Sequence, residues 1–462
     1  MGTQFDSSVP VLVLKIGHYP LAQGIMGAIR SLGRAGVGVH AVVEDRLVPY
    51  AFSKFLRGRI FLPTTGREEA PTLLRHLSQA AKQLGTKSIL LPTDDEAAIF
   101  VAEHGTDLRN DFILPLIEPG LPRMLASKRD LNSLCRQHNV AIPFTHFAQS
   151  VDDVLAFSER APFPLVVKNS EPWVRINAPA VRSTTVVQSR GDLISLAGTW
   201  SHDPQIVLQE YIPQKCAQDW IYHAYFDGQS RPLVTFTGLK QRSWPPYAGV
   251  TAAAIASPNA NLAMAATEFC RAIGYRGIVD MDWRLDLRDN RHKLVDFNPR
   301  LGANFRTFVT EAGIDVVRAL YLDLTGQTVP ISSQDFRRRF IVENLNLASR
   351  LLSGSDRTSK TMKGPAKSEF AWFAADDPLP ALVMAMRFCG QVLLRLLELL
   401  IAASSRVSAR SGSSRYFARG RVRAGNRTPN RSSSEASSAD EAHERSESWR
   451  SGEAGKVEPW NR

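Results

Sequence analysis

Two neighbouring segments decide the fold of this chain, Gly274-Tyr-Arg-Gly-Ile-Val-Asp-Met-Asp-Trp-Arg-Leu-Asp286 and Lys293-Leu-Val-Asp-Phe-Asn-Pro-Arg-Leu-Gly302. Apolar and polar residues alternate with a period of two in both segments, which is typical of half-buried strands. The residues between the two segments include Arg-Asp-Asn-Arg-His and are polar and turn-like. We therefore predict a β-hairpin over residues 274–302.

One face of this hairpin gathers oxygen atoms that suit a hard cation. Asp296 and Asn298 are two residues apart, so they point to the same side of their strand. Either Asp282 or Asp286 of the partner strand can join them there. Magnesium prefers carboxylate and amide oxygens completed by substrate phosphates, and Arg300 adds a positive charge beside them. The pattern predicts a magnesium site, and the alternative is an exposed hairpin with ordinary surface acids.

The composition limits the classes of protein to which this chain can belong. The chain has 462 residues, 44% hydrophobic and 22% charged, as expected for a globular protein of two or three domains. Its four cysteines are far apart, which favours a reducing cytoplasmic compartment over a disulfide framework or a zinc site. The N-terminal apolar run is short and contains Pro10 and Lys15, so we expect a first strand and no signal peptide. The net charge is +11, but much of the arginine lies in the last sixty or so residues and in Arg337-Arg-Arg339, so no nucleic acid is expected as a partner.

Residues 1–120 alternate strand-like and helix-like segments, which predicts an α/β domain with a doubly wound parallel sheet. The first turn, Gly17 to Gly24, lacks the spacing of a dinucleotide fingerprint, so no nicotinamide cofactor is expected. Thr93-Asp-Asp-Glu96 is either a substrate contact beyond the end of a strand or a helix N-cap with acids in the first turn. The predicted strands are 11–14, 37–43 and 88–92, and the predicted helices are 21–35 and 68–84.

A second domain with mixed α and β structure is predicted for residues 121–330. Beyond it we expect an irregular C-terminal extension over 331–380 and a helix over 381–404. Residues 405–462 are rich in Ser and Arg and cannot bury a core, so we expect a disordered tail. The strands predicted in the second domain are 164–168, 184–188, 206–210 and 220–226, besides the hairpin.

Several residues of the second domain suit a nucleotide. Lys168 ends an apolar strand, where an ammonium group needs an anion such as a phosphate. Lys128, at the start of a predicted helix, can supply a second cation. The strand Gln209-Glu-Tyr-Ile212 runs into a bend whose backbone can contact an adenine edge, and Asp219 can accept ribose hydroxyls. Each lysine alone is more often a solvated surface residue.

These features, in this order, resemble the ATP-grasp superfamily, which includes D-alanine ligase, biotin carboxylase and the large subunit of carbamoyl phosphate synthetase. The resemblance covers about residues 10–330 and implies an ATP-grasp fold preceded by a Rossmann-like domain. Carboxylate–amine ligases, the D-aspartate ligases among them, look closest. The resemblance implies nucleotide contacts for Lys128, Lys168, Gln209, Glu210, Tyr211, Ile212 and Asp219, metal ligation by Asp282, Asp296 and Asn298, and contacts with phosphate or substrate for Lys240, Arg242 and Arg300.

The sequence departs from the family pattern in two ways. The final metal acid is usually glutamate, whereas Asp296 is one methylene shorter. The loop that normally closes over the phosphates is rich in glycine, but residues 169–185 contain none. Arg182 and Ser183 of this loop can contact the phosphates instead.

The function predicted from the resemblance is an ATP-dependent ligase that joins a carboxylate to an amine through an acyl phosphate, with ATP and Mg²⁺ (or Mn²⁺) as cofactors. The alternatives are another ATP-grasp reaction, such as phosphoryl transfer without ligation or a carboxylation, and a nucleotide-binding scaffold with weakened catalysis. A nucleic-acid binder that acts through the arginine-rich tail is an alternative from a third class. A homodimer is among the expected assemblies.

The predicted helix over 381–404 is amphipathic. Arginines follow it up to Arg423, so residues 381–423 suit an anionic membrane surface at the cytoplasmic face. The alternative is a helix that packs its apolar face on the protein itself or on a partner subunit. Its polar stripe recurs at steps of four, four and three residues and consists of Arg387, Gln391, Arg395 and Glu398.

Overall fold

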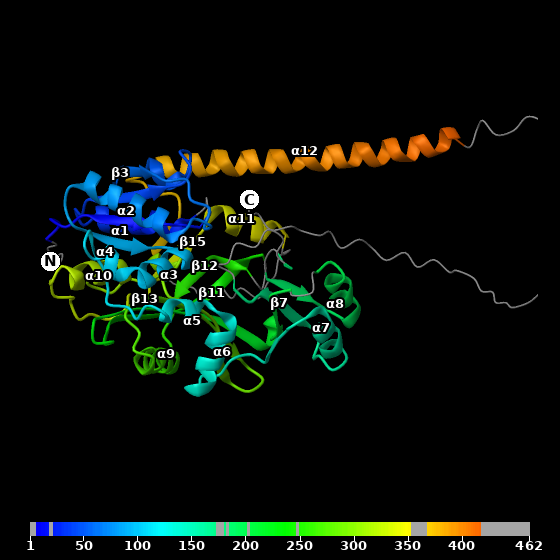
Figure 1. Ribbon diagram of the computed structural model, residues 1–462, viewed down its shortest axis with the longest axis horizontal. Helices are drawn as coiled ribbons and strands as arrows, with labels where there is room; N and C mark the ends of the chain where they lie inside the picture. The colour runs from blue at the N-terminus through cyan, green and yellow to red at the C-terminus, as the bar shows by residue number, and fades with distance from the viewer. Residues whose placement is uncertain are drawn as a thin grey trace, which may run out of the picture. The chain divides into compact units, whose positions relative to one another are not determined.

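The computed structural model describes residues 6–17, 22–171, 180–181, 184–200, 204–245, 249–352 and 367–416. The chain divides into a unit of residues 1–386 and a second unit that begins at Arg387. The first unit contains three β-sheets, which Figure 1 shows together with the helices that cover them.

The N-terminal sheet has five parallel strands in the order β3-β2-β1-β4-β5. All four residues of β1 are buried, as expected for a strand covered on both faces. This confirms the predicted doubly wound α/β domain. The strand order reverses beside β1, so the carboxyl ends of β1 and β4 flank a topological switch point, where such folds bind ligands. The elements are β1 (Val11–Leu14), α1 (Gln23–Gly33), β2 (Val39–Val43), β3 (Leu56–Phe61), α2 (Ala70–Leu84), β4 (Ser88–Pro92), α3 (Asp95–Glu103), α4 (Gly105–Leu108) and β5 (Phe112–Ile113).

A four-stranded antiparallel sheet follows, with the order β6-β9-β7-β8. Its apolar face packs against α7 and α8 in a separate small core. The elements of this part are α5 (Leu121–Ala126), α6 (Lys128–Gln137), β6 (Thr145–Phe147), α7 (Val151–Ser158), β7 (Leu165–Asn169), β8 (Thr185–Val187), α8 (Arg190–Ala197) and β9 (Ile206–Glu210).

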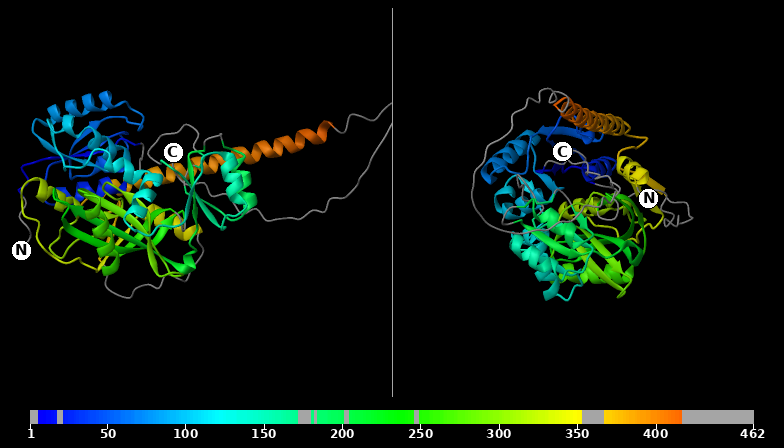
Figure 2. Two further views of the ribbon diagram at one scale, coloured as in Figure 1. Left: turned by 60° about the horizontal axis from the view of Figure 1, so that its bottom comes forward. Right: turned by 90° about the vertical axis from the view of Figure 1, so that its right-hand side faces the viewer.

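The third sheet has seven strands in the order β14-β13-β10-β11-β12-β15-β16, and Figure 2 shows it from two further directions. Aromatic and aliphatic residues on one face of β10, β13 and β14 pack against α9, which leaves the other face of these strands for polar residues. The elements are β10 (Ala217–Phe226), β11 (Pro232–Trp244), β12 (Val250–Ala256), α9 (Ala260–Ala272), β13 (Gly277–Asp286), β14 (Arg291–Asn298), α10 (Val316–Leu324), β15 (Arg338–Ile341), α11 (Glu343–Leu352) and β16 (Lys367–Phe370).

Residues 331–380 are not the irregular extension that the sequence predicted, because β15 and β16 complete the seven-stranded sheet. Ion pairs attach this segment to the rest of the protein. Glu369 of β16 pairs with Arg306, and the buried Asp377 pairs with Arg30 of α1 at 2.9 Å. Glu369 also pairs with Arg338 of β15, which joins the two strands of the segment. These partners are distant in sequence, so no local periodicity indicates the two short strands.

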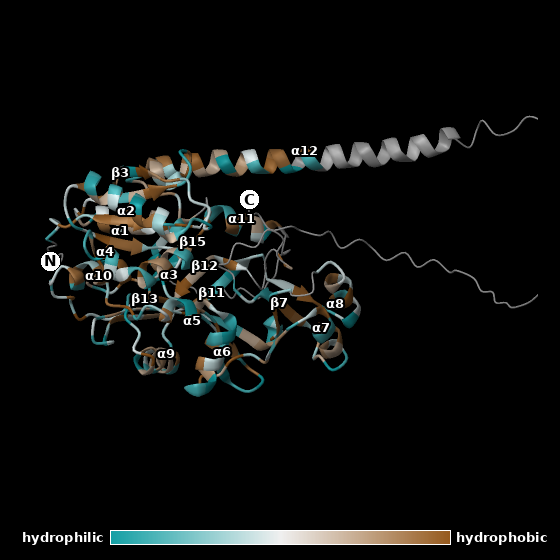
Figure 3. Cartoon of the chain, viewed as in Figure 1, coloured by the Kyte–Doolittle hydropathy of each residue, from teal (hydrophilic) through white to brown (hydrophobic). Residues whose placement is uncertain are grey.

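The C-terminal helix α12 (Leu379–Tyr416) is longer than the predicted helix over 381–404, and it includes the first part of the predicted tail. Its described part shows apolar and polar residues in succession (Figure 3). Within the described residues, no helix has the length and the apolar content that crossing a bilayer would require. Residues 417–462, the rest of the predicted tail, lie outside the described residues.

Candidate active site

The hairpin of β13 and β14 forms where the sequence predicted it, and its register brings the predicted metal ligands together. Asp282 lies directly opposite Asp296, and Asp280 lies opposite Asn298. Side chains at directly opposite positions approach to about 5 Å. The hairpin therefore carries three carboxylates and one amide on one face.

Two lysines neutralise this group of acids from other elements. Lys128, the first residue of α6, forms an ion pair with Asp296. Lys240 of β11 places its Nζ 3.0 Å from Asp282 Oδ1. Both lysines precede the hairpin in the sequence but meet its acids in space, so Asp282 and Asp296 each have a cationic partner.

The two opposite carboxyls differ in their ionisation. Burial raises the pKa of Asp282, and the negative charges of Asp280 and Asp296 add to this rise against the opposing effect of Lys240. Burial also opposes ionisation of Asp296, but Lys128 and Lys168 outweigh it and lower the pKa of this carboxyl below its usual value. Of these two facing carboxyls, Asp296 is therefore the one that remains charged more readily.

The donor set suits magnesium in a site completed by nucleotide phosphates. Among the described residues, no group of three or more His, Cys, Asp and Glu side chains could hold a metal ion by itself. Magnesium does not need such a cage, because one or two carboxylates with substrate phosphates and water suffice. Asp282, Asp296 and the amide oxygen of Asn298 fit this requirement and could hold the ion.

Hydrogen bonds from its guanidinium hold Arg300 beside these candidate ligands. Its Nε donates to Asp95 Oδ1 at 3.0 Å, and its Nη2 donates to Asn298 Oδ1 at 2.9 Å. Its Nη1 donates to the carbonyl of Leu301 at 3.2 Å. Because Asp95 opens α3, the N-terminal domain contributes directly to this part of the site.

The acidic stretch after β4 contains both a helix N-cap and a residue beside the candidate site, the two roles that the sequence left open. Asp94 is the N-cap of α3 and accepts a hydrogen bond from the backbone N–H of Ala97 at 3.0 Å. It also accepts from the backbone of Ile16 and Gly17, which fixes the loop after β1. Asp95 instead reaches Arg300, so one acid caps the helix and the next belongs to the site.

Lys168, a predicted nucleotide contact, is the residue before the last in β7. Its Nζ donates to Gln209 Oε1 at 3.1 Å, and Gln209 is held in turn by Thr145. Burial and the nearby charge of Lys128 lower the pKa of Lys168 to about 8. The direct hydrogen-bond partner of this lysine is thus a neutral amide, and its contact with a phosphate stays a prediction.

The predicted adenine-contacting residues at the end of β9 have side chains that already form ion pairs or hydrogen bonds. The Glu210 carboxylate accepts from Arg288 Nη2 and from Lys293 Nζ, both at 3.3 Å. Asp219, the predicted ribose acid, pairs with Arg284 at 3.2 Å, and that guanidinium lies over the ring of Tyr211. An adenine at this bend would therefore meet backbone groups and the buried side chain of Ile212.

Asp286, the second candidate for the metal site, does not belong to it. It is buried at the far end of the hairpin, where its carboxylate binds Arg288 at 2.6 Å and Lys293 at 2.7 Å. Hydrogen bonds from Arg288 lower its pKa well below the usual value, and Lys293 adds to this effect. Asp286 lies four residues beyond Asp282 on the same strand, about 13 Å further along the ladder, and it faces Arg291 instead of Asp296.

A buried pair beside the candidate metal ligands was not predicted from the sequence. His223 Nε2 lies 2.8 Å from Asp280 Oδ1. A Cβ atom at Gly302 would lie 2.4 Å from both side chains, so glycine is required where the chain returns past them. Asp280 could have been found from its spacing of two residues from Asp282, whereas no local signal identifies His223.

Other predicted residues lie apart from the hairpin acids or outside the described residues. Arg242 follows Lys240 on β11, but its Nη1 donates to Asn346 Oδ1 of α11 at 3.1 Å. Arg182 and Ser183 of the phosphate loop lie outside the described residues, so their predicted roles stay untested.

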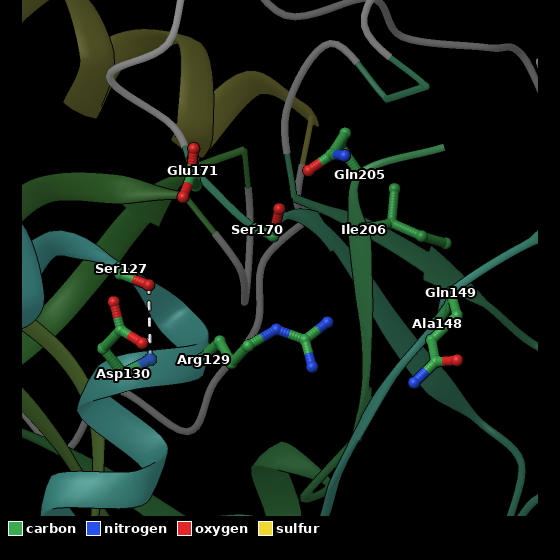
Figure 4. Close-up of a pocket in the computed structure, with 9 residues that line it drawn as sticks. All are labelled: Ser127, Arg129, Asp130, Ala148, Gln149, Ser170, Glu171, Gln205 and Ile206. Carbon is green, nitrogen blue, oxygen red and sulfur yellow. Dashed lines mark hydrogen bonds between the residues drawn. The ribbon is translucent and has the colours of Figure 1, made fainter. Parts of the chain in front are cut away.

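A polar pocket of about 310 Å³ lies next to Lys128, but neither Lys128 nor Lys168 lines it (Figure 4). The backbone N–H of Lys128 donates to the carbonyl of Ser170, which borders this pocket. Figure 4 shows Arg129 extending from the start of α6 into the space between the helix and the strands. The pocket is lined by Ser127, Arg129, Asp130, Ala148, Gln149, Ser170, Glu171, Gln205 and Ile206.

The three sheets and the hairpin acids with two facing lysines form an ATP-grasp fold, and proteins similar to this chain have been characterised. A D-aspartate ligase of Enterococcus faecium is 23% identical over 309 residues, which cover 64% of this chain and 72% of that protein. A biotin carboxylase–β-γ-ATP complex from Campylobacter jejuni has a TM-score of 0.53 at 14% identity and covers 71% of this chain and 74% of its own. The L-amino acid ligase of Bacillus licheniformis has a TM-score of 0.51 at 16% identity, with 69% and 75% covered. No protein-family model matches the chain.

These comparisons confirm the predicted ATP-grasp fold and the predicted class, an ATP-dependent ligase that forms carbon–nitrogen bonds. They do not test the individual site residues, which remain predictions supported by the geometry above.

Proposed function

We propose that this protein activates a carboxylate of an amino acid with ATP and transfers the acyl group to an amine. One observation carries the proposal: Asp282, Asp296 and Asn298 face a common space with Lys128 and Arg300 at its border. This set provides oxygen ligands for a metal, cations for phosphates and a guanidinium for the reacting group. The similarity to a D-aspartate ligase supports an amino acid as the carboxylate substrate.

The reaction has two steps. A carboxylate oxygen attacks the γ-phosphorus, the bond from this phosphorus to the bridging oxygen breaks, and ADP leaves with an acyl phosphate formed. The amine nitrogen then attacks the acyl carbon, loses a proton, and inorganic phosphate leaves. The protein acts through positioning and electrostatics, so it needs no nucleophilic side chain.

Individual residues have distinct tasks in this scheme. Lys128 and Lys168 would bind the phosphates and offset their charge, while Arg300 would orient the acyl group with its guanidinium. When bound, Mg²⁺ would supply charge neutralisation at the phosphate oxygens. Asp282, Asp296 and Asn298 would hold it in place.

The test is ADP release measured against panels of amino acids and amines, with D-aspartate in the first panel. We expect ADP release that requires both a carboxylate and an amine, with one ADP for each amide bond formed. Release with the carboxylate alone, without any product bond, would indicate phosphoryl transfer, and a requirement for bicarbonate would indicate carboxylation. A protein that binds ATP without any turnover would be a scaffold.

For α12 we propose contact with an anionic membrane surface. Leu393, Leu394 and Leu397 are exposed on this helix, while Arg395 and Glu398 pair with each other at 3.1 Å. A helix lying in the interface would bury such leucines and keep the charged stripe in water. The arginines that follow favour anionic lipid by roughly 1 kcal/mol each near the surface.

Flotation with liposomes tests this contact. We expect the protein to float with anionic vesicles at low salt, to be released at high salt, and to lose binding when truncated before Pro380. Protein that stays unbound in a monomeric state would contradict the membrane proposal. An unbound dimer that the truncation dissociates would show that the apolar face packs on a second copy.

A further inference from the structure

A row of polar side chains crosses three neighbouring strands beside Arg300. His223 of β10 lies directly opposite Asp280 of β13, and Asp280 lies directly opposite Asn298 of β14. Side chains at directly opposite positions share a face of the sheet and can contact one another. The row lies two residues along the hairpin from the facing pair of candidate metal acids, so it adjoins the candidate metal site.

The two oxygens of the Asp280 carboxylate have different partners. Oδ1 lies 2.8 Å from His223 Nε2. Oδ2 accepts a hydrogen bond from Asn298 Nδ2 at 3.5 Å and lies 3.6 Å from Arg300 Nη1. Asp280 therefore connects a histidine outside the hairpin to a candidate metal ligand and to the guanidinium proposed to orient the acyl group.

The His223–Asp280 pair has little room to move. The side chain of His223 is fully buried, and that of Asp280 is 9% exposed. The centroids of the His223 and Phe308 rings are 5.1 Å apart, and Phe308 stacks on Phe236. The backbone of Gly302 passes so close that a Cβ atom there would meet both side chains of the pair at 2.4 Å. Closely packed interiors resist displacement, so this packing fixes the position of the Asp280 carboxylate.

Arg300 and Asn298 both depend on this carboxylate. The guanidinium of Arg300 contacts acids from two domains, with Asp95 Oδ1 3.0 Å from Nε and Asp280 Oδ2 near Nη1. The amide of Asn298 donates through Nδ2 to Asp280, while its Oδ1 accepts from Arg300 Nη2 at 2.9 Å. Exchange of the donor and acceptor ends of this amide would break both hydrogen bonds, so the oxygen keeps the position in which it could bind a metal.

We infer that the His223–Asp280 pair is a positioning element of the candidate active site, which keeps the Asn298 oxygen turned toward the metal and the Arg300 guanidinium toward the acyl group. This inference rests on the proposed function and assigns a role to two residues that would touch neither metal nor substrate. Outer partners of this kind orient metal ligands, and their removal costs roughly 10- to 100-fold in metal affinity or activity.

Metal binding tests the inference without turnover. The probe is Mn²⁺ in place of Mg²⁺, titrated into the full-length protein with saturating ADP and followed by the paramagnetic resonance signal of the free ion. Asp280→Asn keeps the shape of the side chain and removes its charge, so we expect Mn²⁺ to bind at least tenfold more weakly. The affinity for ADP without metal should stay within about twofold. In turnover at saturating metal, kcat should fall at least tenfold and the KM for ATP should stay within about twofold, because Arg300 acts on the acyl group.

Two variants of His223 separate positioning from packing. His223→Gln keeps a donor that can reach Asp280, whereas His223→Leu fills the space with an apolar side chain. We expect the glutamine variant to bind Mn²⁺ within about threefold of the parent and the leucine variant to bind it at least tenfold more weakly. A role in packing alone would favour the leucine variant. These variants keep the test valid if Asp280→Asn fails to fold.

The matched control is Asp323→Asn. Asp323 accepts a hydrogen bond from the Tyr225 hydroxyl at 2.6 Å, and Tyr225 lies two residues after His223 on β10. This variant therefore neutralises another carboxylate that contacts the same strand, and we expect it to bind Mn²⁺ like the parent. Parental Mn²⁺ affinity in Asp280→Asn, or equal affinity in the two His223 variants, would overturn the inference. A parent that binds Mn²⁺ and ADP but forms no amide bond would refute the proposed ligase reaction, and the comparison of Mn²⁺ affinities would still decide the positioning role.

Discussion

Asp296→Asn and Asp282→Asn are each expected to lower magnesium-dependent turnover by at least two orders of magnitude, or about 3 kcal/mol of barrier. Each substitution removes one carboxylate from a facing pair and leaves the shape of the side chain unchanged. The ion pair with Lys128 or Lys240 is lost at the same time. The measurement is the rate of ADP release over a range of magnesium concentrations, with thermal unfolding to confirm that the fold is retained.

Asp289→Asn is the matched control for this pair. Asp289 lies in the turn of the same hairpin and pairs with Lys293 at 3.1 Å, away from the facing acids. We expect its turnover and its magnesium dependence to remain parental. If both hairpin variants also turned over at the parental rate, the assignment of the metal ligands would be wrong.

Lys168→Met is expected to abolish most of the stabilisation of the protein by magnesium-ATP without lowering the stability of the free protein. The pKa of Lys168 is lowered to about 8 in the folded state, so folding disfavours its charged form. The unfolded chain therefore binds more protons between pH 8 and the ordinary lysine pKa, and stability of the parent rises with pH across that window. The variant should lack this rise and keep an equal or higher melting temperature at neutral pH.

The ATP effect is measured as the shift in melting temperature at a saturating and a limiting concentration of magnesium-ATP. Lys82→Met on the exposed side of α2 is the control, and we expect its shift to equal that of the parent. A shift of the same size in Lys168→Met would refute the contact between Lys168 and a phosphate.

Local sequence patterns predicted the parts of the site that lie on one hairpin. The alternation in β13 and β14 placed Asp282, Asp296 and Asn298 on one face, because a strand has a fixed period of two. The same rule could not choose between Asp282 and Asp286, because both lie on the same face of β13 and only the register places Asp282 opposite Asp296. Periodicity thus predicts the face of a side chain, whereas its neighbour on the partner strand depends on the register.

Contacts between distant segments could not be predicted in this way. The pairing of Asp95 with Arg300 joins the N-terminal domain to the hairpin, and His223 meets Asp280 through the order of strands in the sheet. The strands β15 and β16 depend on ion pairs such as Glu369 with Arg306, rather than on an apolar pattern. Tertiary structure decides each of these contacts, and single-segment propensities carry little information about it.

The most direct test of the proposed mechanism follows the oxygen atoms. The carboxylate substrate found in the ADP-release screen is labelled with ¹⁸O in its carboxyl group and incubated with ATP, magnesium and the amine. Attack on the γ-phosphorus followed by displacement predicts that one ¹⁸O atom appears in inorganic phosphate for each amide bond formed. Amide product accompanied by unlabelled phosphate would contradict the acyl phosphate and the account of the site built on it.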